Sequence, residues 1–339
     1  MIKIQDIADK AGVSKSAVSL ALNGKSGISD DTRQKILQIA KENNYKPLRK
    51  LKKKAKTKQF FIRILSCNDV NRFTYNFQNL PHFDELIADF STIAREFPIT
   101  LMINSISINN VEMEFKNIEK IQPSDAIILL GTDLPETIVQ KINELHPNVI
   151  IIDTCFYQLN NNFISINNYQ GAYQATEYLL KNGHRHIGYV KARQRIRNFK
   201  ERHRGFNDAL RHYNINPEKS GPVVILSVND ITPHPNYLQN KKLPTAFFCE
   251  NDSLAISLIK SLQCLNIKVP EDVSVIGFDN IAESNVITPE LTTIDVNRRY
   301  MVKTALKEAI EIIQKGKIDQ TQILINTNIV ERKSVRILK

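Results

Sequence analysis

Several charged and amide side chains of this chain come directly after short apolar runs. Each run has the length of a buried strand, and open parallel sheets bind ligands beyond the carboxyl ends of their strands. Carboxylates and guanidinium groups there can form paired hydrogen bonds with the vicinal hydroxyls of a polyhydroxyl ligand. The residues so placed are Asp153, Asn251, Asp252 and Asp279, and Arg202 opens a helical segment that faces the same region. A structural alternative is that Asp252 and Asp279 cap helices or hold turns.

Other catalytic or metal-binding patterns are missing from the sequence. It holds no G-x-G-x-x-G, no G-x-x-x-x-G-K-[ST] and no G-x-S-x-G segment. His184 and His186 have no third ligand in sight, and a catalytic zinc site needs three protein ligands. The four cysteines, Cys67, Cys155, Cys249 and Cys264, lie too far apart for a disulfide ladder. We therefore expect no enzyme activity, no cofactor and no metal.

The net charge of +11 is concentrated at the amino terminus. Residues 1–58 hold 15 Lys and Arg against 5 Asp and Glu, a net of +10, so the other 281 residues are nearly neutral. Such asymmetry indicates a polyanion-binding head, for which nucleic acid and an anionic membrane are the candidate partners. The longest apolar runs are far too short to span a membrane.

Residues 2–45 are predicted to form three short helices. Ser14 and Ser29 stand where helix N-caps belong. Ala8, Gly12 and Val18 match the small residue, the positive-φ turn and the buried anchor of a helix-turn-helix. Short three-helix patterns also occur in proteins that do not bind DNA, but the charge of the head favours DNA.

Beyond residue 59, β-branched runs alternate with amphipathic helical segments, which is typical of βαβ units and parallel sheets. The predicted strands are 60–65, 99–103, 126–130, 149–152, 186–190, 223–226, 246–249 and 273–278. The predicted helices include 83–97, 168–182, 202–214, 253–265 and 299–315. Because this length is large for one sheet, we expect two α/β lobes. A basic linker, Leu48–Lys58, precedes them.

Several longer segments resemble the LacI/GalR (lactose repressor) family of transcription factors. Residues 4–47, IQDIADKAGVSKSAVSLALNGKSGISDDTRQKILQIAKENNYKP, keep the family's A-x-x-A-G-V-S, V-S, L-N-G, I-S, T-R and Y-x-P pattern. The body is similar through NNYQGAYQATEYLLKNGHRHIGYV, RHRGFNDAL, FFCENDSLAI, VPEDVSVIGFDN and PELTTI. The resemblance covers residues 2–47 and about 145–300 well, and residues 60–140 poorly.

This resemblance implies a set of DNA-contacting residues. Lys15 and Ser16 fall on the two principal base-reading positions. The positions that contact phosphates, neighbouring bases or the DNA backbone near the third helix are Ser14, Ser19, Asn23, Ser29 and Thr32. Leu20 stands where many members carry an arginine that can grip guanine, so this leucine either contacts a thymine methyl or packs within the head.

The linker departs from the family pattern. Members usually continue with A-R-x-L, a hinge helix whose leucine enters the minor groove. Lys54 takes the place of that leucine, and Leu51 lies three residues earlier. Either Leu51 becomes the wedge in a shifted helix or the hinge binds through charge. We expect electrostatic anchoring, because residues 46–58 include eight basic side chains and a wedge must be apolar.

For the body, the resemblance implies a periplasmic-binding-protein-like (type I) α/β fold of two lobes with parallel sheets, joined by three crossovers, behind an N-terminal all-α helix-turn-helix domain. Arg202, Asn251 and Asp279 match effector-contacting positions, and Asp153 matches a further one in the other lobe. Residues 66–84 lack the N-P-F/Y segment that often shapes the pocket in relatives, so the identity of the ligand stays open.

These observations predict a DNA-binding domain at 1–47, a linker at 48–59 and a body at 60–339. Lobe 1 is expected at about 60–155 plus 288–318, and lobe 2 at about 156–287 plus 319–339. The expected protein is a cytoplasmic homodimeric repressor, which binds a pseudo-palindromic operator and responds to a small-molecule effector, a sugar or sugar derivative. The alternative is a solute-binding protein of the same fold that does not act through an operator.

Overall fold

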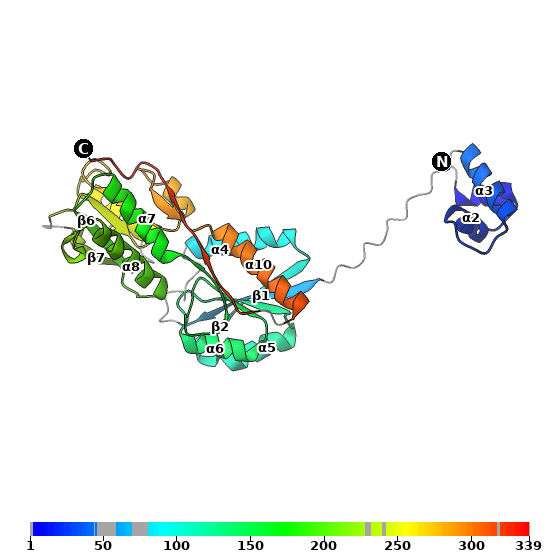
Figure 1. The fold of residues 1–339 in the computed structure, drawn as a ribbon, viewed down its shortest axis with the longest axis horizontal. Coiled ribbons are helices and arrows are strands. Elements are labelled where there is room, and N and C mark those ends of the chain that lie inside the picture. The colour runs from blue at the N-terminus through cyan, green and yellow to red at the C-terminus, as the bar shows by residue number, and fades with distance from the viewer. Residues whose placement is uncertain are drawn as a thin grey trace. The chain divides into compact units, whose positions relative to one another are not determined.

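The computed structural model describes residues 3–43, 45, 59–69, 81–227, 232–238, 242–316 and 319–338. They belong to two compact units that divide between residues 57 and 58 (Figure 1). We call the first unit the head and the second the body, and each is described by itself.

The head is a bundle of three helices, as the sequence predicts: α1 (Ile4–Ala11), α2 (Lys15–Leu22) and α3 (Asp30–Glu42). Gly12 ends α1 with a φ of 68°, a left-handed conformation that glycine adopts without strain. The short turn that follows brings Ser14 to the start of α2. One small core holds the helices together and consists of Ile7, Ala8, Ala11, Val18, Ala21, Ile36 and Ala40.

The first lobe of the body is built on a six-stranded parallel sheet in the order β11-β5-β4-β3-β1-β2. Its strands are β1 (Phe60–Asn68), β2 (Ile99–Ser107), β3 (Ala126–Leu130), β4 (Val149–Ile152), β5 (Asn162–Ile166) and β11 (Gln322–Ile325). Along β3, Ile128 and Leu130 join one core, while Ile127 and Leu129 join another. Continuous apolar runs result because both faces of the sheet are covered.

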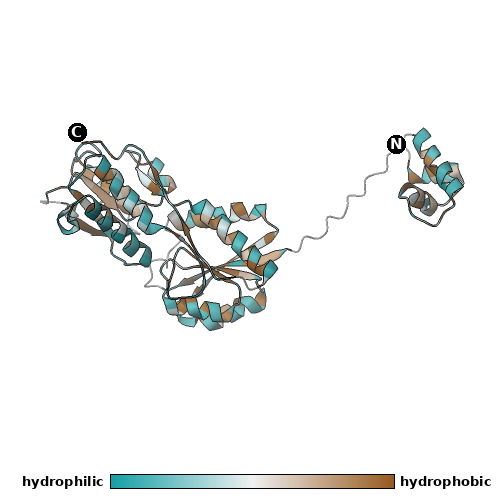
Figure 2. Cartoon of the chain, in the orientation of Figure 1, coloured by the Kyte–Doolittle hydropathy of each residue, from teal (hydrophilic) through white to brown (hydrophobic). Residues whose placement is uncertain are grey.

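Two pairs of helices cover this sheet. α4 (Pro81–Ile93) and α10 (Arg298–Lys315) lie on one face, and α5 (Val111–Ile121) and α6 (Glu136–Leu145) lie on the other (Figure 1). The strands between them are hydrophobic, whereas the outward helix faces are hydrophilic (Figure 2).

The second lobe contains a four-stranded parallel sheet in the order β7-β6-β8-β9. The strands are β6 (Ile187–Ala192), β7 (Val223–Leu226), β8 (Ala246–Cys249) and β9 (Ser274–Ile276), and the helices are α7 (Asn168–Lys181), α8 (Arg197–His212) and α9 (Asp252–Cys264). Phe206 of α8 packs against Tyr189 and Phe248, with ring centroids 4.7 and 5.8 Å away. Short 3-10 turns occur at Ala94–Glu96, Ile108–Asn110, Pro217–Lys219, Pro235–Tyr237 and Ala282–Asn285.

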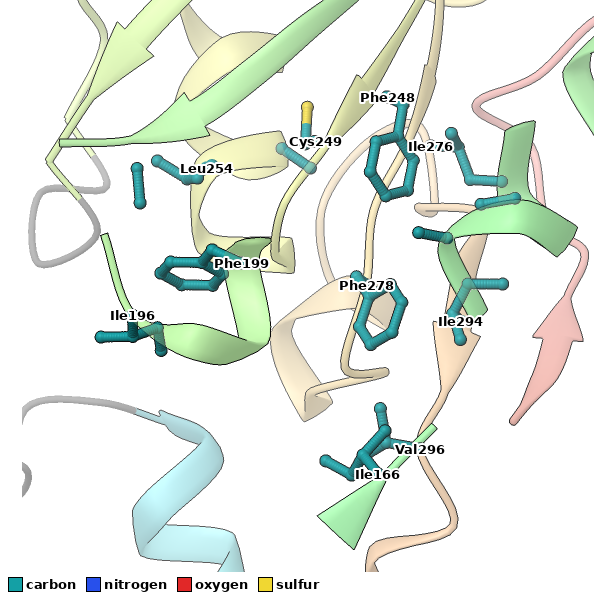
Figure 3. Packing of buried hydrophobic residues seen from close by; sticks show 14 of the residues in the cluster. Ile166, Ile196, Phe199, Phe248, Cys249, Leu254, Ile276, Phe278, Ile294 and Val296 are labelled. Atoms are coloured by element: carbon teal, nitrogen blue, oxygen red, sulfur yellow. The ribbon is translucent and has the colours of Figure 1, made fainter. Parts of the chain in front are cut away.

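Three crossovers join the lobes. The chain passes from β5 to α7, and β10 (Thr293–Asp295) pairs antiparallel with β12 (Asn328–Val330) in the other two connections. An apolar core runs up to these crossovers: Phe278 lies between Phe248 of the second sheet and the pair Ile166 and Val296 (Figure 3).

The sheets correct the predicted lobe boundaries. β5 and β11 pair within the first sheet, so residues 162–166 and 322–325 belong to the first lobe and not to the second. The first lobe therefore extends to the crossover at residue 167. It also includes β11, which follows α10 in the chain. Neither strand is among the predicted ones, because a serine interrupts the apolar run of β5 and β11 is an edge strand with exposed positions.

Candidate functional site

The second helix of the head exposes its first residues. The hydroxyl of Ser14 accepts a hydrogen bond of 3.2 Å from the N–H of Ala17 and so caps α2, as the sequence predicts. Lys15 and Ser16 follow in the first turn, and their side chains are exposed. Val18, on the inner face of the same helix, is fully buried. The helix is thus fixed by its inner side and presents a cation and a hydroxyl outward.

The end of this helix is tied to its own backbone and to α3. Asn23 donates from its amide to the carbonyl of Ser19 at 2.7 Å and to its hydroxyl at 3.3 Å. Leu20 is half-buried, and its Cδ1 lies 3.4 Å from the point where a Cβ on Gly27 would stand. Arg33 of α3 donates to the carbonyls of Leu20 at 3.4 Å and Lys25 at 2.6 Å. Leu20 therefore packs against the loop that follows α2.

Ser29 and Thr32 form the N-cap of α3. The hydroxyl of Ser29 accepts from the N–H of Thr32 at 3.3 Å, and the two hydroxyl oxygens are 2.7 Å apart. Asp30 and Asp31 add negative charge to the first turn, where the helix dipole favours it. Leu51 and Lys54, the two hinge residues of the sequence prediction, lie outside the described residues.

A cavity of about 580 Å³ opens in the body at the carboxyl ends of strands from both lobes. The first lobe lines it with residues that follow β1, β3 and β4, and the second with residues between β6 and the first turns of α8. The lining residues are Asp69, Thr132, Asp133, Leu134, Thr154, Phe156, Gln194, Arg195, Ile196, Arg197, Lys200 and Glu201. This is the edge of the sheets at which the sequence predicts a ligand.

Asp153 lies directly behind this cavity and is buried. Its carboxylate accepts from the hydroxyl of Thr132 at 2.6 Å and from the amide of Asn198 at 3.2 Å, and Asn198 also donates to its carbonyl at 3.0 Å. Its φ of 61° is unusual for a residue other than glycine. Asp153 therefore connects a loop of the first lobe to the first turn of α8.

Arg202 is buried at the centre of a polar network at the crossovers. Its Nε donates to the side-chain oxygen of Asn168 at 2.8 Å, and one of its terminal nitrogens donates to the carbonyl of Glu250. The other lies 3.1 Å from a carboxylate oxygen of Asp279. The ring of Phe278 sits 3.7 Å from the guanidinium carbon. We call Arg202, Asn168, Glu250 and Asp279 the Arg202 network.

Asn251 and Asp252 have different structural roles: Asn251 caps a helix, and Asp252 holds a turn. The side chain of Asn251 caps α9 by accepting from the N–H of Leu254 at 3.0 Å. Asp252 is fully buried, and its carboxylate accepts from the Thr293 hydroxyl at 2.5 Å and from the N–H of Ile281 at 3.0 Å. Burial, helped by the charge of Asp279, raises the pKa of Asp252 well above its ordinary value. Asp252 thus holds a turn and a crossover together.

None of the four predicted effector residues appears among the residues that line this cavity. Asp153, Arg202, Asn251 and Asp279 are all at least nine-tenths buried and form contacts within the protein. The charged groups that do face the cavity, such as Arg195, Arg197 and Lys200, are not among the predicted residues. Their position between a strand end and a helix start was the available signal, since the same rule that selects Asp153 applies to them.

Glu250 holds Arg195 in place at the edge of the cavity. Its buried carboxylate accepts from Arg195 at 2.7 and 2.8 Å, from the hydroxyl of Tyr189 at 2.8 Å and from the N–H of Ala192 at 2.6 Å. Burial raises the pKa of Glu250, and the guanidinium of Arg195 acts against that rise.

His184, one of the two histidines that the sequence places close together, is a core residue. Its ring nitrogens lie 3.0 Å from the Thr245 hydroxyl and 3.1 Å from the carbonyl of Arg336. Over the residues that the structure describes, no group of three His, Cys, Asp or Glu side chains is arranged to hold a metal. Within the same residues, no helix is long and apolar enough to cross a membrane.

Comparisons with known proteins agree with this architecture. Residues 3–47 match the family described as bacterial regulatory proteins, lacI family, and residues 176–335 match the periplasmic binding protein-like domain. The chain is 28% identical over 341 residues to the probable HTH-type transcriptional repressor ExuR of Bacillus subtilis (strain 168), and the match covers 99% of each chain. It is 29% identical to the HTH-type transcriptional repressor PurR of Aliivibrio fischeri (strain MJ11), over 99% of this chain and 98% of PurR.

Solved structures show the same fold. The Lac repressor dimer bound to operator and the anti-inducer ONPF aligns with a TM-score of 0.68 at 21% identity, and the match covers 99% of both chains. The transcriptional regulator CelR–cellobiose complex aligns with a TM-score of 0.68 at 19% identity, over 98% of this chain and 100% of CelR. This chain therefore joins a lacI-family helix-turn-helix head to a two-lobed periplasmic binding protein-like body, and relatives that are transcriptional repressors match it over nearly its whole length.

Proposed function

We propose that this chain is a transcriptional repressor that acts in the cytoplasm. Two copies bind a pseudo-palindromic operator with their heads, and a small molecule in the cavity of the body changes the affinity for that operator. The observation that carries the proposal is α2, an eight-residue helix that is anchored by Val18 and exposes Lys15 and Ser16 at its start. Recognition helices contact base edges with their amino-terminal residues.

The same helix indicates how DNA would be contacted. Lys15 and Ser16 would face base edges, with Ser14, Ser29 and Thr32 near phosphates at the starts of α2 and α3. Helix starts favour anions through their N–H groups and dipole. Because Leu20 packs against the Gly27 loop, we assign it a structural role within the head.

The cavity of the body is the proposed effector site. Its volume of about 580 Å³ lies within the range of roughly 300–1,000 Å³ typical of small-molecule sites. The Lac repressor structure contains ONPF, and the CelR structure contains cellobiose. We therefore propose a sugar-like effector. Asp153 would support the cavity from both sides, since it connects Thr132 of the first lobe to Asn198 of α8, and Glu250 of the Arg202 network would hold Arg195 at the edge of the cavity.

An apolar groove on the second lobe is the proposed contact between the two copies. It has a volume of about 260 Å³ and is lined by Ser253, Ile256, Lys260, Ile281, Glu283, Val286 and Ile287. Val286 is 81% exposed, which is costly for an isolated chain and favourable once a second chain covers it.

Footprinting of the DNA upstream of the protein's own gene tests the proposal. At low salt we expect one protected pseudo-palindrome, which disappears with the double variant Lys15→Ala, Ser16→Ala. Absence of any protected palindrome with the unmodified protein would overturn the proposal. Light scattering tests the dimer: Val286→Asp should give monomers that bind the operator much more weakly, whereas Val223→Asp, at an exposed position of β7, should leave the dimer intact.

A further inference from the structure

The cations that line the cavity all stand on one of its two walls. The first lobe contributes the carboxylates Asp69 and Asp133, neither of which is free of other interactions. The second lobe contributes the carboxylate Glu201 and three cations, Arg195, Arg197 and Lys200, which we call the basic wall. These three cations lie within six consecutive residues, and like charges held so close repel one another unless anions compensate them.

The position of the basic wall increases that cost. Arg197 and Lys200 lie in the first turn of α8, which contains no acidic residue, and Ile196 at the N-cap has no side-chain cap. The positive end of the helix dipole disfavours cations at this place. In its first turn, α8 thus holds charge of the sign that the helix dipole disfavours.

Acidic neighbours compensate only part of this charge. Glu250 pairs with Arg195, and Glu201, which also lines the cavity, pairs with Arg204 at 2.7 Å. Arg197 lies over the ring of Tyr157, 4.6 Å from its centroid. A guanidinium stacked in this way keeps its planar edge for hydrogen bonds. Lys200 is exposed and lines the cavity.

We propose that the molecule bound in this cavity is a polyhydroxy acid, whose anionic group contacts the basic wall. Its hydroxyls then contact the first lobe, where Asp133 and Thr132 can accept or donate hydrogen bonds. Guanidinium groups bind carboxylate and phosphate in two-pronged fashion, so either anion fits this wall. The inference rests on the proposed effector site and makes it more specific: a neutral sugar leaves the basic wall without its counter-ion.

Binding measurements on the full-length protein at constant ionic strength test this inference. Calorimetry with D-gluconate and D-glucuronate probes the carboxylate, and D-glucose 6-phosphate and inorganic phosphate probe the phosphate. D-glucose is the neutral counterpart. We expect at least one anionic compound to bind at least tenfold more tightly than D-glucose, and the better arm assigns the anion.

Variants show whether the anion binds at the basic wall. Lys200→Gln, at an exposed position that should not disturb folding, is expected to weaken anion binding about tenfold, and Arg197→Gln at least as much. Arg193→Gln removes the same charge from a neighbouring exposed position that does not line the cavity, and should bind anions like the wild type. Because the basic head is unchanged in all three variants, anions bound there cancel in the comparison.

Three results would overturn the inference: D-glucose binding as tightly as the anions, no binding of any anion, or equal anion binding by Lys200→Gln and wild type. Operator affinity without ligand is measured separately. A protein that binds no operator contradicts the proposed repressor function alone. A protein that binds its operator but is released by a neutral sugar, regardless of Lys200, contradicts only the polyhydroxy acid.

Discussion

The head and the body hold the site residues that the sequence predicts in opposite ways. In the head, Lys15 and Ser16 stand exposed on a short helix, and one buried face of that helix fixes them. In the body, Arg202, Asp153 and Asp279 are buried and bonded to other protein groups before any ligand arrives. Replacing one of these body residues therefore breaks contacts within the protein, whereas replacing Lys15 or Ser16 leaves the buried face of α2 unchanged.

This difference follows from what each region must do. DNA binds to the outer surface of a protein, so its bases can be contacted by exposed side chains. An effector acts only if its binding energy differs between two arrangements of the lobes. Arg202 contacts Asn168 at the start of α7 and Glu250 at the end of β8, so its network is anchored in elements next to a crossover.

The largest expected effect comes from Arg202→Met. It leaves Asp279 as a buried carboxylate without its cation, and loss of one partner of a buried pair costs roughly 3–5 kcal/mol. Chemical unfolding should show this loss in the body transition and none in the head. The control Arg204→Met removes an exposed guanidinium that pairs with Glu201, and should cost at most about 1 kcal/mol.

Asp279→Asn combined with Arg202→Met sharpens the same comparison. Neutralising the stranded carboxylate should recover part of the stability that Arg202→Met loses. If Arg202→Met instead unfolds like wild type and loses only its response to effector, Arg202 contacts the ligand directly and does not act by holding the crossovers together.

The next effect in size is the loss of operator affinity in Lys15→Gln. A lysine that contacts a base edge contributes about 1–3 kcal/mol, and each half-site should lose it, whereas the unfolding of the body should not change. Fluorescence anisotropy at fixed salt measures the affinity. Lys35→Gln on the exposed side of α3 is the charge-matched control. Equal losses for the two variants would mean that Lys15 acts by charge and reads no base.

A smaller effect is expected at Leu20 of the head. In its degree of burial, this side chain is intermediate between the exposed Lys15 and the buried site residues of the body. Leu20 is half-buried, so Leu20→Ala should lower the stability of the head by about 1 kcal/mol, less than a fully buried leucine loses. Binding-site selection should return the same preferred bases as wild type, whereas Leu20→Arg should add a guanine to each half-site. An altered preference in Leu20→Ala would show that this leucine contacts a base after all.

The sequence predicts those parts of the molecule that local rules determine. The caps at Ser14 and Ser29 depend only on residues within one turn, and both are present. The strands 126–130, 149–152 and 246–249 have the predicted bounds because they are buried on both faces and therefore read as unbroken apolar runs. Strands β5 and β11 escape prediction, since neither shows such a run.

The sequence predicts where the cavity lies in the fold, but not which residues line it. The carboxyl ends of the strands mark the edge of the sheets at which the cavity opens. They do not show which side chains point into it. The side chains of Asp153 and Asp279 are buried, and their backbones have φ values of 61° and 113°. Positive φ values are uncommon in residues other than glycine, so the sequence does not predict them. The fate of Arg202 depends on Asn168 and Glu250, which lie 34 and 48 residues away in the chain. Long-range pairing of this kind has no local signal.

The smallest effect that we expect is a difference between the head and the body in how their stability depends on pH. The head contains no histidine, whereas His184 is buried in the body, and burial lowers its pKa. Above its ordinary value of about 6.5 the ring is neutral in both states, and its full contribution to stability is present. As the pH falls below that value, the unfolded chain binds a proton that the folded body resists, so the body loses stability and the head does not.

The slope of stability against pH isolates His184 from other groups. His203 also has a lowered pKa and acts in the same direction, while the raised pKa values of Glu250 and Asp252 act in the opposite one. The measured quantity is therefore the difference in slope between wild type and His184→Gln, from chemical unfolding between about pH 5.5 and pH 7.5. Wild type should lose more body stability over that interval than the variant does, even if the variant is less stable at every pH. Parallel slopes would mean that His184 titrates in the folded body as it does in the unfolded chain, and that its burial has no part in the difference between the two regions.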